Sequence, residues 1–526
     1  MSSRRGLTLG FACVAAFMSG VDQTVVTIAL PAIQRDLGAS GPEVQWLITG
    51  YSVAFAALMI AGGTIGDRYG RKRVFLAGMS LFTLGSACAA LAPNIGVLIA
   101  ARVLSGVGAA FMVPTTLALI ASVYPPDERG RAIGIWAATS GLAVAFGPMV
   151  GGALVQSAGW EWVFWINVPV GIVAVLAGAR LLGETAGEER TGHLDVPGLA
   201  LVVPGLFALT YAITAGGHDG FGNATVLACL AAAIVLLVAF AAWERRSPAP
   251  MVRAEMVRRR RFLGPLAVLT VMYFALIGIL VYLSLYYQSV RGYSPLTAAL
   301  FFLPTTVVVV ICAPVAGGLA DRLGPRRFGV LGALCVAASL GALVGLGTDT
   351  AVWVLLVSQL LLGLGVGLAD PPLSATILSS VDVEDAGVAS ATEGMVETLG
   401  GALGVAILGA LAGAFSSSAF SDAIGDSALS APAKANAVAA FEPLQLPPVP
   451  AGGSAAAQAA VDHAAQSAFA SGLGSAALVG ALLCLVAAAL AYFTIAPKAA
   501  PAPDPDRALH PARIRHHLGR LRLRRP

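Results

Sequence analysis

Charged residues are scarce in this sequence. Only 11% of its 526 residues are Asp, Glu, Lys or Arg, whereas a soluble domain carries about a quarter. Cysteine is scarce too: the six cysteines all fall in apolar stretches and none is in a Cys-x-x-Cys pair. This excludes a disulfide framework and a cysteine-based zinc site. With a mean hydropathy of +0.82, the low charge also excludes disorder and an ordinary soluble enzyme.

The sequence also lacks the short motifs of enzymes and ATP-driven pumps. It has no Gly-x-Ser-x-Gly and no Gly-x-x-x-x-Gly-Lys phosphate loop, and its six histidines show no metal-ligand spacing. These absences argue against a membrane enzyme, against a bound metal and against transport driven directly by ATP hydrolysis.

Long apolar stretches are abundant. Fourteen of them are about as long as the ~20 residues that a helix needs to cross a bilayer. They are continuous rather than alternating, which indicates helices and not barrel strands. Their bounds are 7–31, 44–63, 74–92, 95–119, 132–155, 163–182, 196–215, 224–243, 262–287, 296–320, 328–347, 351–371, 388–412 and 472–495. The sequence therefore predicts an all-α membrane protein with fourteen transmembrane helices.

The distribution of Lys and Arg predicts the orientation. With both termini in the cytoplasm, 28 of the 32 basic residues lie in cytoplasmic segments, three lie outside, and Arg102 lies within a span. This asymmetry fits the positive-inside rule, so we expect a multi-pass protein of the cell membrane. The basic tail, 498–526, is expected to lie on anionic cytoplasmic lipid; binding of nucleic acid is the disfavoured alternative.

One pattern occurs twice. The segment Gly63–Arg73 resembles Gly317–Arg327, 254 residues later, and Arg102–Gly108 resembles Gln359–Gly365, 257 residues later. Both offsets equal eight spans, an even number, so the two halves run parallel. Two such bundles with a site between them at the midplane are typical of secondary transporters, whereas a sensor or channel would not need the charged loop in both halves.

The repeat divides the chain into four parts. Residues 1–183 form a first six-helix bundle, 184–261 form two inserted helices and a basic loop, 262–497 form a second six-helix bundle, and 498–526 form the tail. The long outside loop 413–471 is rich in Ala, Ser and Pro. We expect it to be a flexible or partly helical cap rather than a folded domain.

The repeated charged loop predicts a cytoplasmic latch between the bundles, closed when the site faces outward. Its glycines permit a tight turn. Asp67 can accept hydrogen bonds from a helix N-terminus, and Arg68 and Arg71 can bridge to acidic groups. A simple positive anchor would not need Asp and Gly at fixed places. The latch residues are Gly63, Asp67, Arg68, Gly70, Arg71, Asp321 and Arg322.

Two charged residues are expected deep in the first bundle. Counted from the outer ends of their spans, Asp22 lies at ~13 Å and Arg102 at ~10 Å, at 1.5 Å per residue. These depths permit an ion pair or a water-linked contact. A static ion pair is one interpretation. Since protonation of Asp22 would free Arg102, the pair can also act as a proton switch.

Span five contains Gly147, Pro148, Gly151 and Gly152. The proline kinks the helix and the glycines permit close approach of a neighbour. Ordinary small-residue packing would explain any two of them.

Span thirteen carries Glu393 and Glu397, four residues apart and so on one helical face. They would give a substrate-binding surface negative charge that suits an organic cation, unless the helix begins later and leaves Glu393 at the interface. Asp370, which precedes Pro371 and Pro372, is expected at the membrane interface.

These motifs together resemble the major facilitator superfamily, specifically its fourteen-helix drug:proton antiporter branch, over about residues 7–495. The motifs are Asp22 through Leu30-Pro31, Trp46 and Tyr51, the 63–73 loop, Arg102 with Gly106 and Gly108, Gly147-Pro148 with Gly151-Gly152, the 160–171 segment that contains Asn167, and Tyr293-Ser-Pro295 through Pro304. Glu161 departs from the family, which usually has Arg there.

The resemblance implies a major-facilitator-like fold of two six-helix bundles plus two inserted helices. It implies that Asp22 and Arg102 take part in proton coupling and that the glycine–proline motif favours export. The expected protein is a monomeric exporter of amphipathic drugs or antibiotics, cations among them, with protons as coupling ion and no other cofactor. The alternative is an exporter dedicated to one endogenous metabolite.

Overall fold

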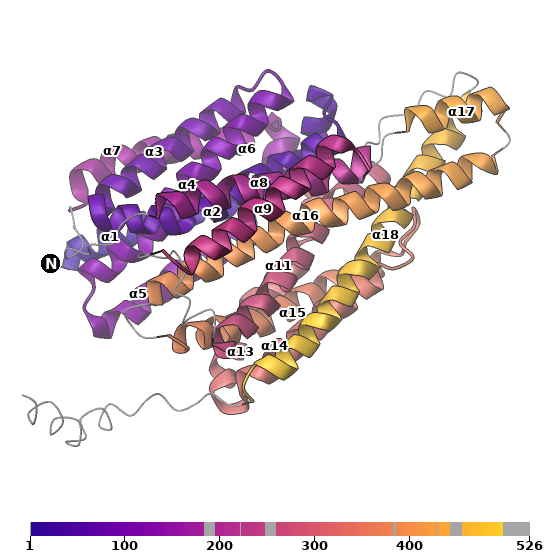
Figure 1. The fold of residues 1–526 in the computed structure, drawn as a ribbon. Helices are drawn as coiled ribbons and strands as arrows, with labels where there is room; N and C mark the ends of the chain where they lie inside the picture. The colour runs from indigo at the N-terminus through magenta and orange to yellow at the C-terminus, as the bar shows by residue number, and fades with distance from the viewer. Residues whose placement is uncertain are drawn as a thin grey trace, which may run out of the picture.

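The computed structural model describes residues 2–183, 195–220, 222–247, 259–381, 386–427, 429–441 and 455–497 (Figure 1). Within these ranges every regular element is a helix. The linker 184–194, most of the basic loop before residue 259, residues 442–454 of the outer loop and the tail 498–526 lie outside the described residues.

The helices form two bundles that follow one another along the chain. The first consists of α1 (Ser2–Leu37), α2 (Gly41–Tyr69), α3 (Arg71–Ala90), α4 (Ile95–Val123), α5 (Pro126–Ala158), α6 (Trp162–Trp165) and α7 (Asn167–Leu181). The second consists of α11 (Arg260–Leu285), the π-helix η1 (Tyr286–Val290), α12 (Pro295–Leu300), α13 (Leu303–Leu323), α14 (Pro325–Ala342), α15 (Val352–Ser379), α16 (Ala386–Gly425), α17 (Ala431–Ala440) and α18 (Ala455–Thr494). The bundles meet where α1 contacts α11, α5 contacts α12 and α2 contacts α16.

The repeat found in the sequence recurs in the packing. A Cβ at Gly108 on α4 would lie 2.9 Å from the Gly78 carbonyl oxygen on α3, and a Cβ at Gly365 on α15 would lie 2.7 Å from the Gly332 carbonyl oxygen on α14. Both helix pairs therefore cross at glycine contacts that leave no room for a side chain. The two bundles repeat the same helix crossing, as a parallel repeat requires.

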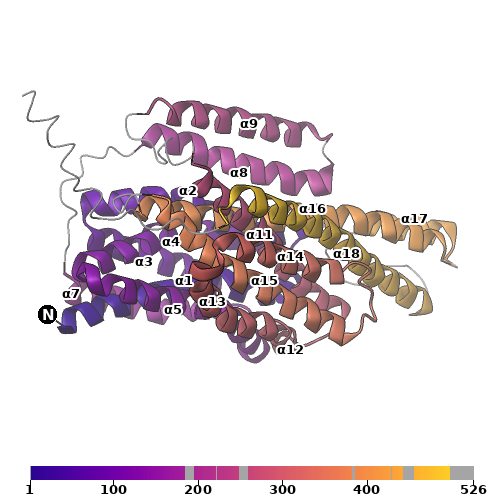
Figure 2. The same ribbon diagram turned by 90° about the horizontal axis from the view of Figure 1, so that it is seen from below.

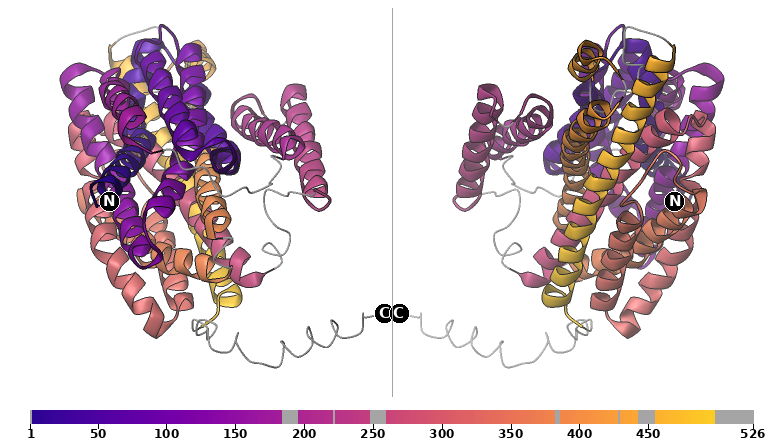
Figure 3. Two further views of the ribbon diagram at one scale, coloured as in Figure 1. Left: turned by 90° about the vertical axis from the view of Figure 1, so that its left-hand side faces the viewer. Right: turned by 90° about the vertical axis from the view of Figure 1, so that its right-hand side faces the viewer.

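The two inserted helices, α8 (Val196–Asp219) and α9 (Ala224–Glu244), stand at the edge of the molecule (Figures 2 and 3). They pack on each other, and α8 also contacts α2 and α16. In the contact with α2, the Phe207 ring stacks on the Trp46 ring with centroids 6.4 Å apart. Asp195 holds the pair together, since its Oδ1 accepts hydrogen bonds from the Gly198 amide (2.9 Å) and from Trp243 Nε1 (2.6 Å).

Most of the described part of the 413–471 loop is helical. Helices α16 and α18 each run for 40 residues, or ~60 Å at 1.5 Å per residue, about twice the thickness of a bilayer core. Their outer ends and α17 share an apolar cluster in which Phe420 and Phe441 stack with centroids 4.0 Å apart. The cap thus has a small core of its own.

The expectation of an all-α membrane fold is confirmed. Each of the fourteen predicted spans coincides with a helix or, at 163–182, 262–287 and 296–320, with two consecutive helices. In the described part of the chain, eleven helical segments are long and apolar enough to cross a membrane. The count of fourteen crossings stays a prediction.

Candidate functional site

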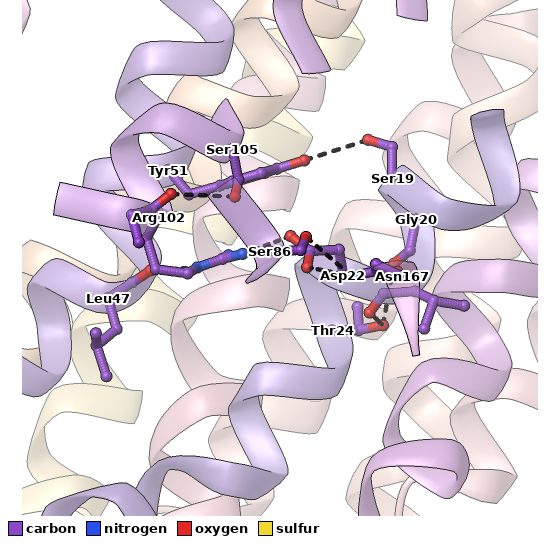
Figure 4. Close-up of polar contacts among 12 residues, drawn as sticks. Ser19, Gly20, Asp22, Thr24, Leu47, Tyr51, Ser86, Arg102, Ser105 and Asn167 are labelled. Atoms are coloured by element: carbon purple, nitrogen blue, oxygen red, sulfur yellow. Dashed lines mark hydrogen bonds and ion pairs between the residues drawn. The ribbon is translucent and has the colours of Figure 1, made fainter. Parts of the chain in front are cut away.

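A buried ion pair lies in the first bundle. Asp22 on α1 is 0% exposed and Arg102 on α4 is 1% exposed, and the Arg102 Nη1 donates to Asp22 Oδ2 (Figure 4). The structure therefore brings together the two residues that the sequence placed at similar depth. They come from helices separated by 80 positions in the chain.

Further groups hold the Arg102 side chain in place. Its Nε donates to the carbonyl oxygen of Leu47 on α2 at 3.1 Å, and its guanidinium carbon lies 4.3 Å from the centroid of the Tyr51 ring. A buried charge without partners is strongly unfavourable, and removal of one partner from such a pair costs roughly 3–5 kcal/mol. Arg102 thus depends on Asp22 for neutralisation, while α2 supplies contacts that remain if Asp22 takes up a proton.

Asn167 is a third member of this site, and the sequence interpretation did not assign it a role. Its Nδ2 donates to Asp22 Oδ1 at 3.0 Å and lies 3.4 Å from Ser86 Oγ (Figure 4). Both carboxylate oxygens of Asp22 therefore have a donor. The only sequence signal for Asn167 was its place in the 160–171 motif, since it lies 145 positions from Asp22.

A group of three carboxylates lies in the second bundle. The carboxylate oxygens of Asp370 on α15 and of Glu393 and Glu397 on α16 all lie within 4.8 Å of one another. The Asp370 Oδ1 atom is buried and accepts no hydrogen bond from the residues that the structure describes. Three ionised carboxylates so close together repel one another, and protons, an organic cation or a metal ion would relieve that repulsion.

The predicted end of span twelve at residue 371 is wrong, and with it the reason for expecting Asp370 at the membrane interface. Helix α15 does not end at Pro371 and Pro372 but continues to Ser379, which places Asp370 about 13 Å from the helix end at 1.5 Å per residue. Prolines are tolerated within membrane helices because neighbouring groups satisfy the backbone groups that they leave free.

The carboxylate group is close to the boundary between the bundles. On α16, Gly394 lies between the two glutamates in sequence, and a Cβ there would lie 3.3 Å from the Met59 sulfur on α2. This segment of α16 therefore packs against the first bundle. A transport site is expected at such a boundary.

The three glycines of the glycine–proline motif in α5 face two different partners. A Cβ at Gly147 would overlap the Thr24 hydroxyl on α1, and a Cβ at Gly151 would lie 2.8 Å from the Val25 carbonyl oxygen, also on α1. A Cβ at Gly152 would instead lie 2.8 Å from the Ala299 Cβ on α12, in the second bundle. Pro148, between them, is buried. The motif thus joins α5 to the helix that carries Asp22 and also to the other half.

The two charged loops share a backbone turn. Gly70 has φ 105° and Gly324 has φ 85°, values that favour glycine, at the junctions of α2 with α3 and of α13 with α14. A Cβ at Gly63 would lie 3.7 Å from the Pro114 Cβ of α4, and Arg322 is exposed. The side chains of Asp67, Arg68 and Asp321 lie outside the described set.

The basic residues of these loops bind the ends of other helices in their own bundle. Lys72 Nζ donates to the Ala179 carbonyl oxygen near the end of α7, and Arg326 Nε donates to the Ile495 carbonyl oxygen just after α18, both at 2.7 Å. Arg71 Nη1 donates to the Ala118 carbonyl oxygen on α4 at 3.0 Å. Cations at helix C-termini are favourable, so each loop holds together the helix ends on its side of its bundle.

The chain matches the family model of the Major Facilitator Superfamily over residues 12–405. It is 35% identical over 489 residues to the tetracenomycin C resistance and export protein of Streptomyces glaucescens, covering 93% of this chain and 91% of that protein. It is 38% identical over 393 residues to the puromycin resistance protein of Streptomyces alboniger (74% and 78% covered). It is 34% identical over 411 residues to the multidrug resistance protein Stp of Mycobacterium tuberculosis (78% and 76% covered).

The fold is similar to that of a solved bacterial homologue of the human lysosomal transporter Spinster, with a TM-score of 0.64 at 18% sequence identity, covering 95% of this chain and 100% of that one. The family match, the relatives and the two-bundle fold agree with one another. The chain is a membrane transporter of the Major Facilitator Superfamily and not an enzyme.

Proposed function

We propose that this transporter is a proton-coupled antiporter that exports amphipathic drugs or antibiotics from the cell. The observation that carries the proposal is the presence of one acidic site in each half, the buried pair Asp22 and Arg102 in one and three buried or half-buried carboxylates in the other. The names of the relatives, which are antibiotic and multidrug resistance proteins, support drug efflux. An exporter dedicated to one endogenous metabolite is the alternative.

The proton step uses the first site. When Asp22 is ionised, it holds α1 to α4 through Arg102 and to α7 through Asn167. A proton on Asp22 removes the charge that neutralises Arg102, whose other contacts are the Leu47 carbonyl oxygen and the Tyr51 ring on α2 and, at 5.8 Å, the Phe164 ring on α6. Protonation thus weakens the link of α1 to its neighbours and permits the two halves to rearrange.

The substrate step uses the second site. A bound organic cation would favour the ionised carboxylates at Asp370, Glu393 and Glu397, whereas protons would neutralise them. Cation and protons therefore compete for the same oxygens, and such competition is a direct physical basis for exchange. No metal or other cofactor takes part in this scheme; protons are the coupling ion.

Glu397→Gln is expected to weaken export of lipophilic cations selectively. Loss of one buried charge partner corresponds to roughly tenfold or more in apparent affinity for a cation, whereas neutral substrates should change less. The measurement is the concentration dependence of cation and neutral-drug export from cells that carry each variant. Asp349→Asn, on an exposed outer turn, is the matched control. An equal loss for both substrate types would remove the carboxylates from substrate selection.

Asp67→Asn or Arg71→Ala is expected to slow turnover more than it weakens substrate binding, because the loop closes the cytoplasmic end of the bundle. We expect a lower maximal rate of drug transport in vesicles, with direct drug binding nearly unchanged. Lys434→Ala, in the outer cap, is the charge control. Weaker binding at an unaltered maximal rate would argue against a latch.

Both termini are proposed to lie in the cytoplasm of a monomeric protein in the cell membrane, with small molecules and not nucleic acid as partners. Topology reporters fused after Gly183 and Arg261 should then report cytoplasm, and those near Gly217 and Ser430 should report the outside. An outside signal after Arg261 would contradict the fourteen-helix arrangement.

Drug uptake into inverted vesicles tests the proposed function directly. An imposed pH gradient, acidic inside, should drive accumulation of a fluorescent lipophilic cation, and a protonophore should abolish it. A panel of chemically unrelated antibiotics in resistance assays separates the two alternatives, because a dedicated metabolite exporter would protect against few or none of them.

A further inference from the structure

A proline in α1 leaves one backbone carbonyl without its normal helical donor. Pro31 has no N–H, so the carbonyl of Thr27, four residues earlier, lacks its i+4 hydrogen bond. Ser284 Oγ on α11 donates to this carbonyl oxygen at 2.7 Å. Ser284 is 0% exposed. A hydroxyl of the second bundle thus satisfies a carbonyl that the proline of the first bundle sets free.

A second side chain, in the element that follows α11, continues this contact. Gln288 lies in the π-helix η1, and its Nε2 donates to the Ile28 carbonyl oxygen at 3.0 Å and to Ser284 Oγ at 3.1 Å. Turns of π-helix often occur at functional sites. Two polar side chains of one bundle therefore bind two consecutive carbonyls of the other.

These contacts lie on the side of the molecule predicted to be extracellular. Thr27 is five residues beyond Asp22 on α1, toward the outer end of the helix. On the same side, α5 meets α12 at Gly152. The two bundles are thus closed against each other at their outer ends, and a transporter that opens alternately to each side must separate them there.

We propose that Ser284 and Gln288 form an extracellular gate, which closes on the α1 carbonyls at Thr27 and Ile28 and opens once in each transport cycle. Its bonds are neutral and few, so they can break without leaving a buried charge unpaired. Both side chains bind across the boundary between the two bundles, and this boundary must open when the transport site faces outward. The gate is built on the helix that carries Asp22, so a shift of α1 moves both together.

The proposal rests on alternating access in the proposed function, but its test needs neither a drug nor a proton gradient. Nitroxide labels on Asp36→Cys and Asp349→Cys, both at exposed outer positions of opposite halves, report the outer separation by pulsed EPR. The background has its six native cysteines replaced by alanine. Ser284→Ala and Gln288→Ala should each raise the population ratio of the longer to the shorter distance about threefold, as loss of one hydrogen bond in a membrane protein predicts.

Thr270→Val is the matched control, because the Thr270 hydroxyl on α11 bonds within its own helix, to the Leu266 carbonyl oxygen. It should leave the distance distribution unchanged. If Ser284→Ala and Gln288→Ala also leave it unchanged, the gate does not exist, whatever the outcome for proton coupling.

Pro31→Ala provides a second test. It restores an N–H that can bond the Thr27 carbonyl within α1, so the effect of Ser284→Ala should be clearly smaller in the Pro31→Ala protein than in the parent. An effect of full size in both proteins would contradict the role of the proline-freed carbonyl and overturn the proposal.

Discussion

Asp22→Asn is expected to reduce export driven by a proton gradient to the background of vesicles that lack the protein. Asparagine keeps the shape of the side chain and an oxygen that can accept from Arg102, but it cannot exchange a proton. The protein should therefore still insert and fold. The measurement is drug accumulation in inverted vesicles under an imposed pH gradient, normalised to the amount of protein in the membrane.

Two further variants distinguish proton exchange from loss of structure. Asp22→Glu keeps an ionisable group and should retain part of the activity. Arg102→Ala should be inactive as well, but with less protein in the membrane, because it leaves a buried carboxylate unpaired at a cost of roughly 3–5 kcal/mol. Full proton-driven export by Asp22→Asn would remove this residue from the mechanism.

Gly152→Val is expected to abolish transport while leaving the protein folded. A Cβ at Gly152 would lie 2.8 Å from the Pro295 carbonyl oxygen and 2.9 Å from the Leu296 Cα. These are backbone atoms of the opposite bundle, which cannot move aside without separating the halves. The variant should therefore stay open on the outer side, and drug export should fall to background while drug still binds.

Gly62→Val is the contrasting variant, because its side chain would meet the backbone of Ala110 and Phe111 within the first bundle. Here we expect misfolding and little protein in the membrane. Normal transport by Gly152→Val would show that the contact of α5 with α12 is not needed for closure.

The sequence was sufficient to predict the features that depend on hydropathy and local pattern. Length and polarity located the helices, and the repeated loop predicted two parallel halves. Counting residues from the outer ends of their spans placed Asp22 and Arg102 at similar depth, because the rise per residue of an α-helix is constant. None of these inferences needed knowledge of which helices are neighbours.

Contacts between distant helices could not be predicted in the same way. Asn167 reaches Asp22 only because α7 packs beside α1, and one sequence gives neither helix rotation nor neighbour order. The end of the helix that carries Asp370 was misplaced for another reason: two consecutive prolines were taken as the end of a helix, which is a sound rule in water but a weaker one in a membrane. Ser284 binds the backbone carbonyl of Thr27, and the pattern of side chains along a sequence does not show which backbone groups two distant helices bring together.

The central claim is that drug and protons move in opposite directions through one cycle, and proton movement driven by drug alone tests it most directly. Purified protein in proteoliposomes with an internal pH dye should show a pH change when a lipophilic cation gradient is imposed without any pH gradient. The change should reverse with the direction of the drug gradient and should vanish in Asp22→Asn. Drug movement without any accompanying pH change, in protein that transports the drug normally, would contradict the account.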